Sequence, residues 1–159
     1  MALTFMVPGL DEATSEKTIS ILQSRLSQEQ EAALVLKHVH WNLTGPNFIA
    51  VHEMIDPQVD VVLAQADETA ERIATLGGSP DGRADAITRV RTWVKFPLEG
   101  RAGTEEYLKA LDAYYSEFIR ADRTAIAELD DLDVISSNIV QDHVQELEKF
   151  QWLMRSHLV

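Results

Sequence analysis

Five histidine and carboxylate side chains in the first half of the chain have the types and spacing of metal ligands. They are His40, His52, Asp56, Asp67 and Glu71. His52 and Asp56 are four positions apart, as are Asp67 and Glu71, so each pair lies on one face of a helix. Imidazole and carboxylate groups without sulfur suit Fe(II), Mn(II) or Zn(II). The pattern therefore indicates a divalent metal site with coordination positions open to water or an oxidant.

The two pairs cannot bind the same ion within one straight helix. Asp56 and Asp67 are eleven residues apart, which is about 16 Å along a helix axis, whereas a metal–ligand bond is about 2 Å long. A second copy, antiparallel across a two-fold axis near Val61 and Val62, would place one carboxylate pair opposite its mate's histidine–aspartate pair. We therefore expect the site at a symmetric interface, with two sites per dimer.

The apolar residues of the same helix form a separate stripe, which is expected to face the core of its own subunit. The ligand sector lies beside this stripe, with Val59 and Leu63 between the two ligand pairs. Such pairs are also common on solvated helix faces, so a surface without metal is the alternative interpretation. The stripe consists of Phe48, Val51, Ile55, Val62, Ala66, Ile73 and Leu76.

Glycine and proline divide the chain into four long helical stretches, and no series of strands is indicated. Thr14 or Ser15 is expected to cap the first helix. Pro57 lies inside the second and should kink it, the alternative being two helices broken at Asp56. The expected helices span residues 15–43, 47–76, 104–129 and 133–158.

A connection of 27 residues, 77–103, joins the second and third helices, and residues 84–93 could form a short extra helix within it. Such a connection is long enough to cross a bundle lengthwise, as ferritin-like folds require. The sequence thus predicts an all-α, ferritin-like antiparallel four-helix bundle with a short extra helix. We expect one domain over residues 1–159, with an N-terminal extension at 1–14.

Charge and composition limit the possible partners. The 14 Lys and Arg residues face 26 Asp and Glu, a net charge of −12, which disfavours nucleic-acid and anionic-membrane binding and favours cations. The absence of cysteine excludes disulfides and zinc–thiolate sites. No apolar run approaches the roughly 18 residues of a membrane span, and the first ten residues lack a basic signal-peptide region. A cytoplasmic protein is expected.

Residues 37–78 resemble the signature of the Dps family, the miniferritins, and the resemblance extends over nearly the whole chain. The family pattern joins a His-Trp-Asn tripeptide, a Gly-x-x-Phe turn, His-x-x-x-Asp, Asp-x-x-x-Glu-Arg and a Leu-Gly-Gly stop. The matching residues are His40-Trp41-Asn42, Gly45 with Phe48, His52 with Asp56, Asp67 with Glu71-Arg72, and Leu76-Gly77-Gly78.

This resemblance implies a homo-oligomeric shell, a dodecamer built on two-fold dimers. In such a shell, Fe(II) is oxidised at inter-subunit ferroxidase sites, preferably by hydrogen peroxide, and stored as ferric mineral, which protects against oxidative damage. Zinc or manganese could occupy the same site. His40, His52 and Asp56 would come from one subunit, and Asp67 and Glu71 from its mate.

The resemblance also implies roles for residues outside the five ligands. Trp41 would intercept oxidising equivalents, the alternative being a packed aromatic. Glu53 would face the cavity and bind iron during mineral nucleation, the alternative being a solvated glutamate. Acidic residues at 128–133 would lie near three-fold pores, the alternative being an acidic helix N-terminus with its N-cap.

Two other functions compete with iron storage. DNA-binding members of the family use mobile basic tails, whereas the first lysine here is Lys17 and no basic segment follows the last helix. A DNA-compacting role is therefore disfavoured, and DNA binding is not expected. Metal-assisted hydrolysis at the same interface site is the other alternative, because a bound metal ion can activate water.

Overall fold

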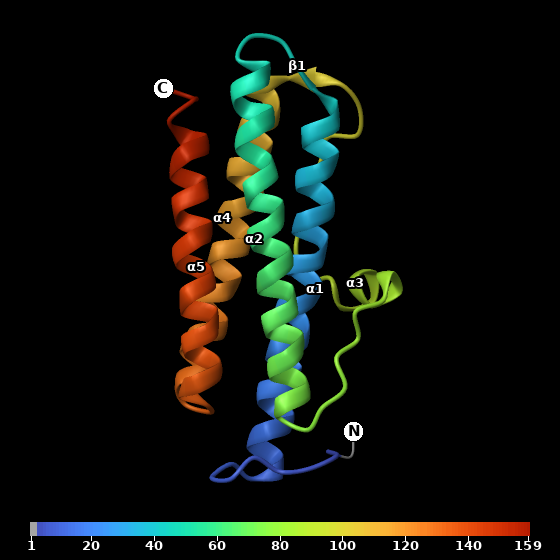
Figure 1. Cartoon of the computed structure of the whole chain (residues 1–159), viewed down its shortest axis with the longest axis vertical. Helices are drawn as coiled ribbons and strands as arrows, with labels where there is room; N and C mark the ends of the chain where they lie inside the picture. The colour runs from blue at the N-terminus through green and yellow to red at the C-terminus, as the bar shows by residue number, and fades with distance from the viewer. Residues whose placement is uncertain (1–2) are drawn as a thin grey trace.

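The computed structural model describes residues 3–159, which form four long helices, one short helix and two very short strands (Figure 1). The four long helices make up the bundle, and the short α3 lies outside it. This confirms the predicted all-α bundle with an extra short helix. The helices are α1 (Glu12–Asn42), α2 (Phe48–Thr75), α3 (Ala84–Val90), α4 (Thr104–Asp130) and α5 (Val134–Arg155).

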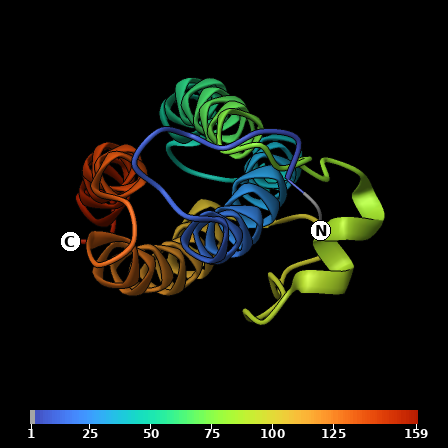
Figure 2. The same cartoon turned by 90° about the horizontal axis from the view of Figure 1, so that it is seen from below.

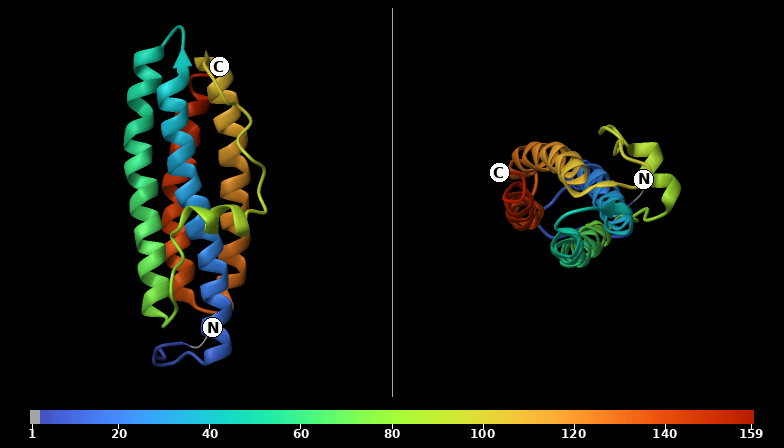
Figure 3. Two further views of the ribbon diagram at one scale, coloured as in Figure 1. Left: turned by 90° about the vertical axis from the view of Figure 1, so that its right-hand side faces the viewer. Right: turned by 90° about the horizontal axis from the view of Figure 1, so that it is seen from above.

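The segment between α2 and α4 crosses the whole length of the bundle (Figure 3). As a result, α2 and α4 run in the same direction, while α1 pairs with α2 and α4 pairs with α5 in antiparallel fashion (Figures 1 and 2). At one end, β1 (Leu43–Thr44) pairs in parallel with β2 (Ala102–Gly103). This pairing fixes the α1–α2 turn against the start of α4, close to the histidines of interest.

The α1 N-cap differs from the predicted one, and the alternative of a broken second helix is excluded. The N-cap of α1 is Asp11, whose side chain accepts a hydrogen bond from the Thr14 backbone N–H at 2.8 Å. The expectation of a cap at Thr14 or Ser15 is therefore wrong, because a better acceptor lies one turn earlier and Ser15 is buried inside the helix. Pro57 lies within a continuous α2, so a break at Asp56 is also wrong.

The predicted apolar stripe of α2 packs into the bundle: Phe48 is partly buried, and the other six residues are fully buried. The expectation that Val59 lies in the ligand sector beside this stripe needs correction. Val59 is only 4% exposed and belongs to the core, because it lies one turn from both Ile55 and Val62. Leu63 remains on the outer face, where it is 51% exposed.

The N-terminal residues that the structure describes lie across the end of the bundle where α2 finishes (Figure 2). The Thr4 backbone N–H donates to the Gly77 carbonyl at 2.9 Å. Gly77 has a φ of +85°, and a Cβ there would collide with the Phe5 carbonyl oxygen, so glycine is required. Residues 1 and 2 of the expected extension lie outside the described residues. None of the described helices is long and apolar enough to cross a bilayer.

Candidate metal centre

His40 and His52 face each other where α1 ends and α2 begins. Their rings stack with centroids 3.6 Å apart. Nδ1 of His40 lies 3.1 Å from the carbonyl oxygen of His52, and Nδ1 of His52 lies 3.0 Å from the carbonyl oxygen of His40. A carbonyl can only accept, so these contacts favour the tautomer with the proton on Nδ1. Each Nε2 then keeps its lone pair for a cation.

Asp56 lies one turn after His52 on α2, contacts His40 and carries a full negative charge. Its Oδ1 lies 3.2 Å from Nδ1 of His40 and 2.7 Å from Nζ of Lys37. The hydrogen bond from Lys37 is the main cause that lowers the pKa of Asp56, and the nearby histidines add to it. The carboxylate is therefore ionised at neutral pH and available to a metal ion, in competition with the lysine ammonium.

Asp67 and Glu71 lie further along α2 and do not reach this group. Both are exposed, and their side chains make no hydrogen bond or ion pair with any residue in the range 3–159. Within that range of one copy, no three His, Cys, Asp or Glu side chains are arranged to hold a metal ion. The five predicted ligands are thus divided: His40, His52 and Asp56 lie together, and the other two lie apart.

Three further residues lie next to the histidine pair in the sequence or in space. Trp41 follows His40 and is 71% exposed, so it is not packed within its own subunit. Glu53 follows His52 and is also exposed. Phe48 stacks on His52 with centroids 5.0 Å apart, which further restrains the ring.

Lys37 and the support from Phe48 were missed in the sequence. The spacing of Lys37 and His40, three residues apart on one helix, was the available signal for the lysine. It does not reveal Asp56 as the partner, because Asp56 lies on the next helix and is brought close only by the α1–α2 turn.

We expect Lys37→Met to tighten divalent-ion binding by a few-fold. The ammonium competes for Asp56 Oδ1, and an exposed ion pair of this kind is worth about 0.2–1 kcal/mol. Co²⁺ titration of the assembled protein, followed by its visible absorption, measures the change. Lys149→Met is the matched control, because Lys149 pairs with Glu146 on the exposed side of α5. Unchanged or weaker Co²⁺ binding in Lys37→Met would contradict the competition.

The bundle, its lengthwise crossover and the comparison with known families define the class of the protein. Residues 19–159 match the family described as "Ferritin-like domain". The chain is 49% identical to the DNA protection during starvation protein of Mycolicibacterium smegmatis, over 98% of this chain and 84% of that protein. It is 47% identical to a protein of Haemophilus ducreyi named fine tangled pili major subunit, over 96% of this chain and 80% of that one.

Solved structures agree with these relatives. The tetragonal form of Mycobacterium smegmatis Dps superposes with a TM-score of 0.94 at 49% identity, covering 97% of this chain and 94% of that one. The chain belongs to the Dps family within the ferritin-like proteins. The family resemblance and the fold expected from the sequence are both confirmed.

Proposed function

We propose that this protein is a cytoplasmic iron-storage and detoxification protein. It binds Fe(II) at ferroxidase sites shared between subunits, oxidises it preferably with hydrogen peroxide, and stores ferric mineral inside a dodecameric shell. The observation that carries this proposal is the half-site of His40, His52 and Asp56. Each of its imidazoles has Nδ1 against a carbonyl oxygen, which leaves Nε2 to bind a cation, but it lacks the further carboxylates that the chain places elsewhere on α2.

A second copy supplies those carboxylates in this proposal. Asp67 and Glu71 are exposed and have no side-chain partners within the described residues of their own chain. Leu63 and Ile49 lie on the same outer face of α2 and are also exposed, which favours burial against another subunit. An antiparallel two-fold contact along α2 would bring the carboxylates of one copy to the histidines of the other.

The chemistry follows from collecting two Fe(II) ions at one site. Each ion gives one electron, and the two electrons cleave the O–O bond of one hydrogen peroxide molecule to two hydroxide ions. Delivering both electrons together prevents release of a hydroxyl radical, which a single electron would produce. Trp41, beside His40 and accessible, is placed to intercept an oxidising equivalent that escapes this pairing. Zinc or manganese would occupy the same nitrogen and oxygen ligands.

Charge favours delivery of the substrate and growth of the mineral. A net charge of −12 per chain raises the local concentration of Fe(II) around an assembled shell. Glu53 is exposed beside the half-site, and in this proposal it binds iron where mineral begins to form.

The test is addition of Fe(II) and sub-stoichiometric peroxide to the purified protein. We expect rapid oxidation with iron remaining soluble and co-eluting with the protein in size-exclusion chromatography. Asp67→Ala serves as the reference in which oxidation is slow. Ferric precipitation at the rate of a protein-free sample would contradict the proposal.

We also expect that DNA is not retained at physiological ionic strength, about 0.15 M. The net charge of −12 per chain repels the phosphate backbone. A plasmid gel-shift assay at about 0.15 M salt checks this. A variant with an added lysine-rich tail is the positive control, and a shift by the parent protein under these conditions would contradict the expectation.

A further inference from the structure

The stretch of α2 that carries Asp67 and Glu71 is anchored to its own bundle by the residues beside them. These neighbours form polar contacts with α1 and α5. The neighbours are Glu68, Thr69 and Arg72.

Arg72 forms the anchor nearest the end of α2. Its side chain is largely buried; Nη2 donates to Oδ2 of Asp133 at 2.6 Å, and Nε donates to Oγ of Ser136 at 2.9 Å. Asp133 is also the N-cap of α5, where its carboxylate accepts the Ser136 backbone N–H at 3.2 Å. The N-cap interpretation given above for the acidic residues at 128–133 is therefore confirmed for Asp133. Arg72 thus joins the last turns of α2 to the first turn of α5.

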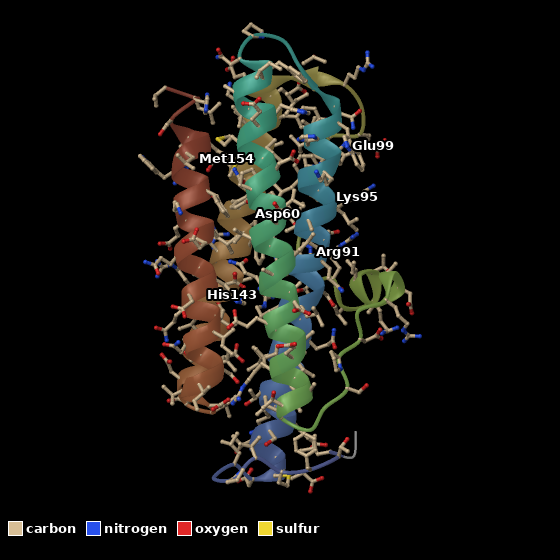
Figure 4. All side chains as sticks on the ribbon, in the orientation of Figure 1. Asp60, Arg91, Lys95, Glu99, His143 and Met154 are labelled. Carbon is tan, nitrogen blue, oxygen red and sulfur yellow. The ribbon has the colours of Figure 1, made fainter. Side chains whose placement is uncertain are left out.

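A second anchor lies one turn earlier and is centred on a buried histidine, although its partner Glu68 is 57% exposed. His143 on α5 is labelled in Figure 4 and is 4% exposed. Its Nε2 lies 3.0 Å from a carboxylate oxygen of Glu68, and its Nδ1 lies 3.2 Å from Oε1 of Glu29 on α1. The Thr69 hydroxyl donates to the same Glu29 oxygen at 3.1 Å. Three helices therefore meet at this group of charges.

The two halves of the proposed site are held in different ways. His40 contacts both His52 and Asp56, so the three side chains are oriented directly by one another through His40. Asp67 and Glu71 have no side-chain partner among residues 3–159, so the placement and rotation of α2 alone set where they point. A small rotation or shift of this stretch would move both carboxylates together.

We infer that Arg72, acting through Asp133, and His143, acting through Glu68, are positioning residues for the carboxylate half of the site. The inference rests on the proposed function, because it assumes that Asp67 and Glu71 bind iron. Loss of a residue that orients a ligand commonly costs 10–100-fold in metal affinity. These residues act through the helix backbone, so we expect the lower end of that range or less.

The experiment compares Arg72→Gln with the parent protein in peroxide-driven Fe(II) oxidation. We expect the KM for Fe(II) to rise about threefold to tenfold, because loosened ligands bind the ion less well. The kcat should stay within about twofold, because a site that has bound its iron reacts normally. Co²⁺ titration should weaken in parallel. Arg72→Lys should restore part of the affinity, since an ammonium can pair with Asp133 but lacks the planar fork that also reaches Ser136.

A matched control separates positioning from general destabilisation. Arg123→Gln removes the same charge from an exposed ion pair between α4 and Glu148 on α5, and it should leave KM unchanged. Adding Asp133→Asn to Arg72→Gln should raise KM no further if Arg72 acts through that carboxylate. A further independent increase in KM would contradict this route.

Ser136→Ala covers the case in which Arg72→Gln fails to assemble, because it removes one acceptor of Arg72 and keeps every charge. Asp67→Ala distinguishes the two levels of failure. If neither the parent nor Asp67→Ala oxidises Fe(II), the proposed function is wrong, and so is this inference, which rests on it. If the parent is active and Asp67→Ala is not, yet Arg72→Gln and Ser136→Ala lower the melting temperature without changing KM, only the positioning role of Arg72 is overturned.

Discussion

Co-assembly of His52→Ala chains with Asp67→Ala chains should restore Fe(II) oxidation that neither variant supports alone. Each substitution removes one ligand from a site with few, so each variant by itself should lose most of its activity. In a mixed dimer, one shared site carries both lesions and the other carries none. With random pairing, half of the dimers are mixed and half of their sites are intact, so about a quarter of the parental activity should return.

The measurement is peroxide-driven Fe(II) oxidation by shells refolded from the mixture and from each variant separately. A mixture of His52→Ala with Asp56→Ala is the matched control. Each chain then carries its lesion in its own histidine–aspartate half-site. Every site of a mixed dimer therefore keeps one defect, and no rescue is expected. A first mixture no more active than its components, despite verified mixed dimers, would show that the site is not shared between subunits.

Replacing Arg25 with Met should destabilise the protein by about 3–5 kcal/mol near pH 8, because it leaves a buried carboxylate without its cation. Nη1 of Arg25 on α1 lies 2.9 Å from Oδ1 of Asp122 on α4, and both side chains are buried. By contrast, Arg123→Met should cost no more than about 1 kcal/mol, since its ion pair with Glu148 is exposed.

The loss should be smaller near pH 5. Burial raises the pKa of Asp122 to about 7, and Arg25 offsets part of that effect, so removing Arg25 should raise the pKa further. A raised pKa means that the folded state holds the proton more tightly than the unfolded chain. The stabilisation from protonating Asp122 is therefore present at low pH and is lost as the pH rises through the folded-state value.

Chemical denaturation at about pH 5 and about pH 8, at one fixed protein concentration, measures both effects. The double variant Arg25→Met/Asp122→Leu should recover most of the stability, because neither charge remains buried. An equal loss at the two pH values, or a loss no larger than that of Arg123→Met, would contradict this account of the pair.

Local patterns predicted the elements of the fold because helices obey a short-range period. Glycine and proline marked the ends of α1 and α2 and the start of α4, and the apolar stripe of α2 packs where its 3.6-residue period placed it. The prediction of the α1 cap was wrong for a local reason as well: Thr14, Ser15 and Asp11 are all acceptable N-caps by residue type, and the Asp11 carboxylate is the one that accepts the Thr14 backbone N–H.

The candidate site divides along the same line. The spacing of His52 and Asp56, and of Asp67 and Glu71, is visible in the sequence because positions four residues apart share a helix face. Their division between two copies is a prediction from helix length, and the complementation experiment tests it. The exposure of Trp41 and Glu53 could not be read from sequence, because exposure depends on which neighbouring elements pack over a side chain.

Only the tertiary structure decided the partners of the charged residues. Lys37 meets Asp56, Arg25 meets Asp122, and His143 lies between Glu29 and Glu68, in each case across two or more helices. A charged side chain read from sequence is expected on the surface, because burying an unpaired charge is costly. Here the bundle brings opposite charges together from distant positions, which lowers that cost, and no local period in the sequence encodes such pairing.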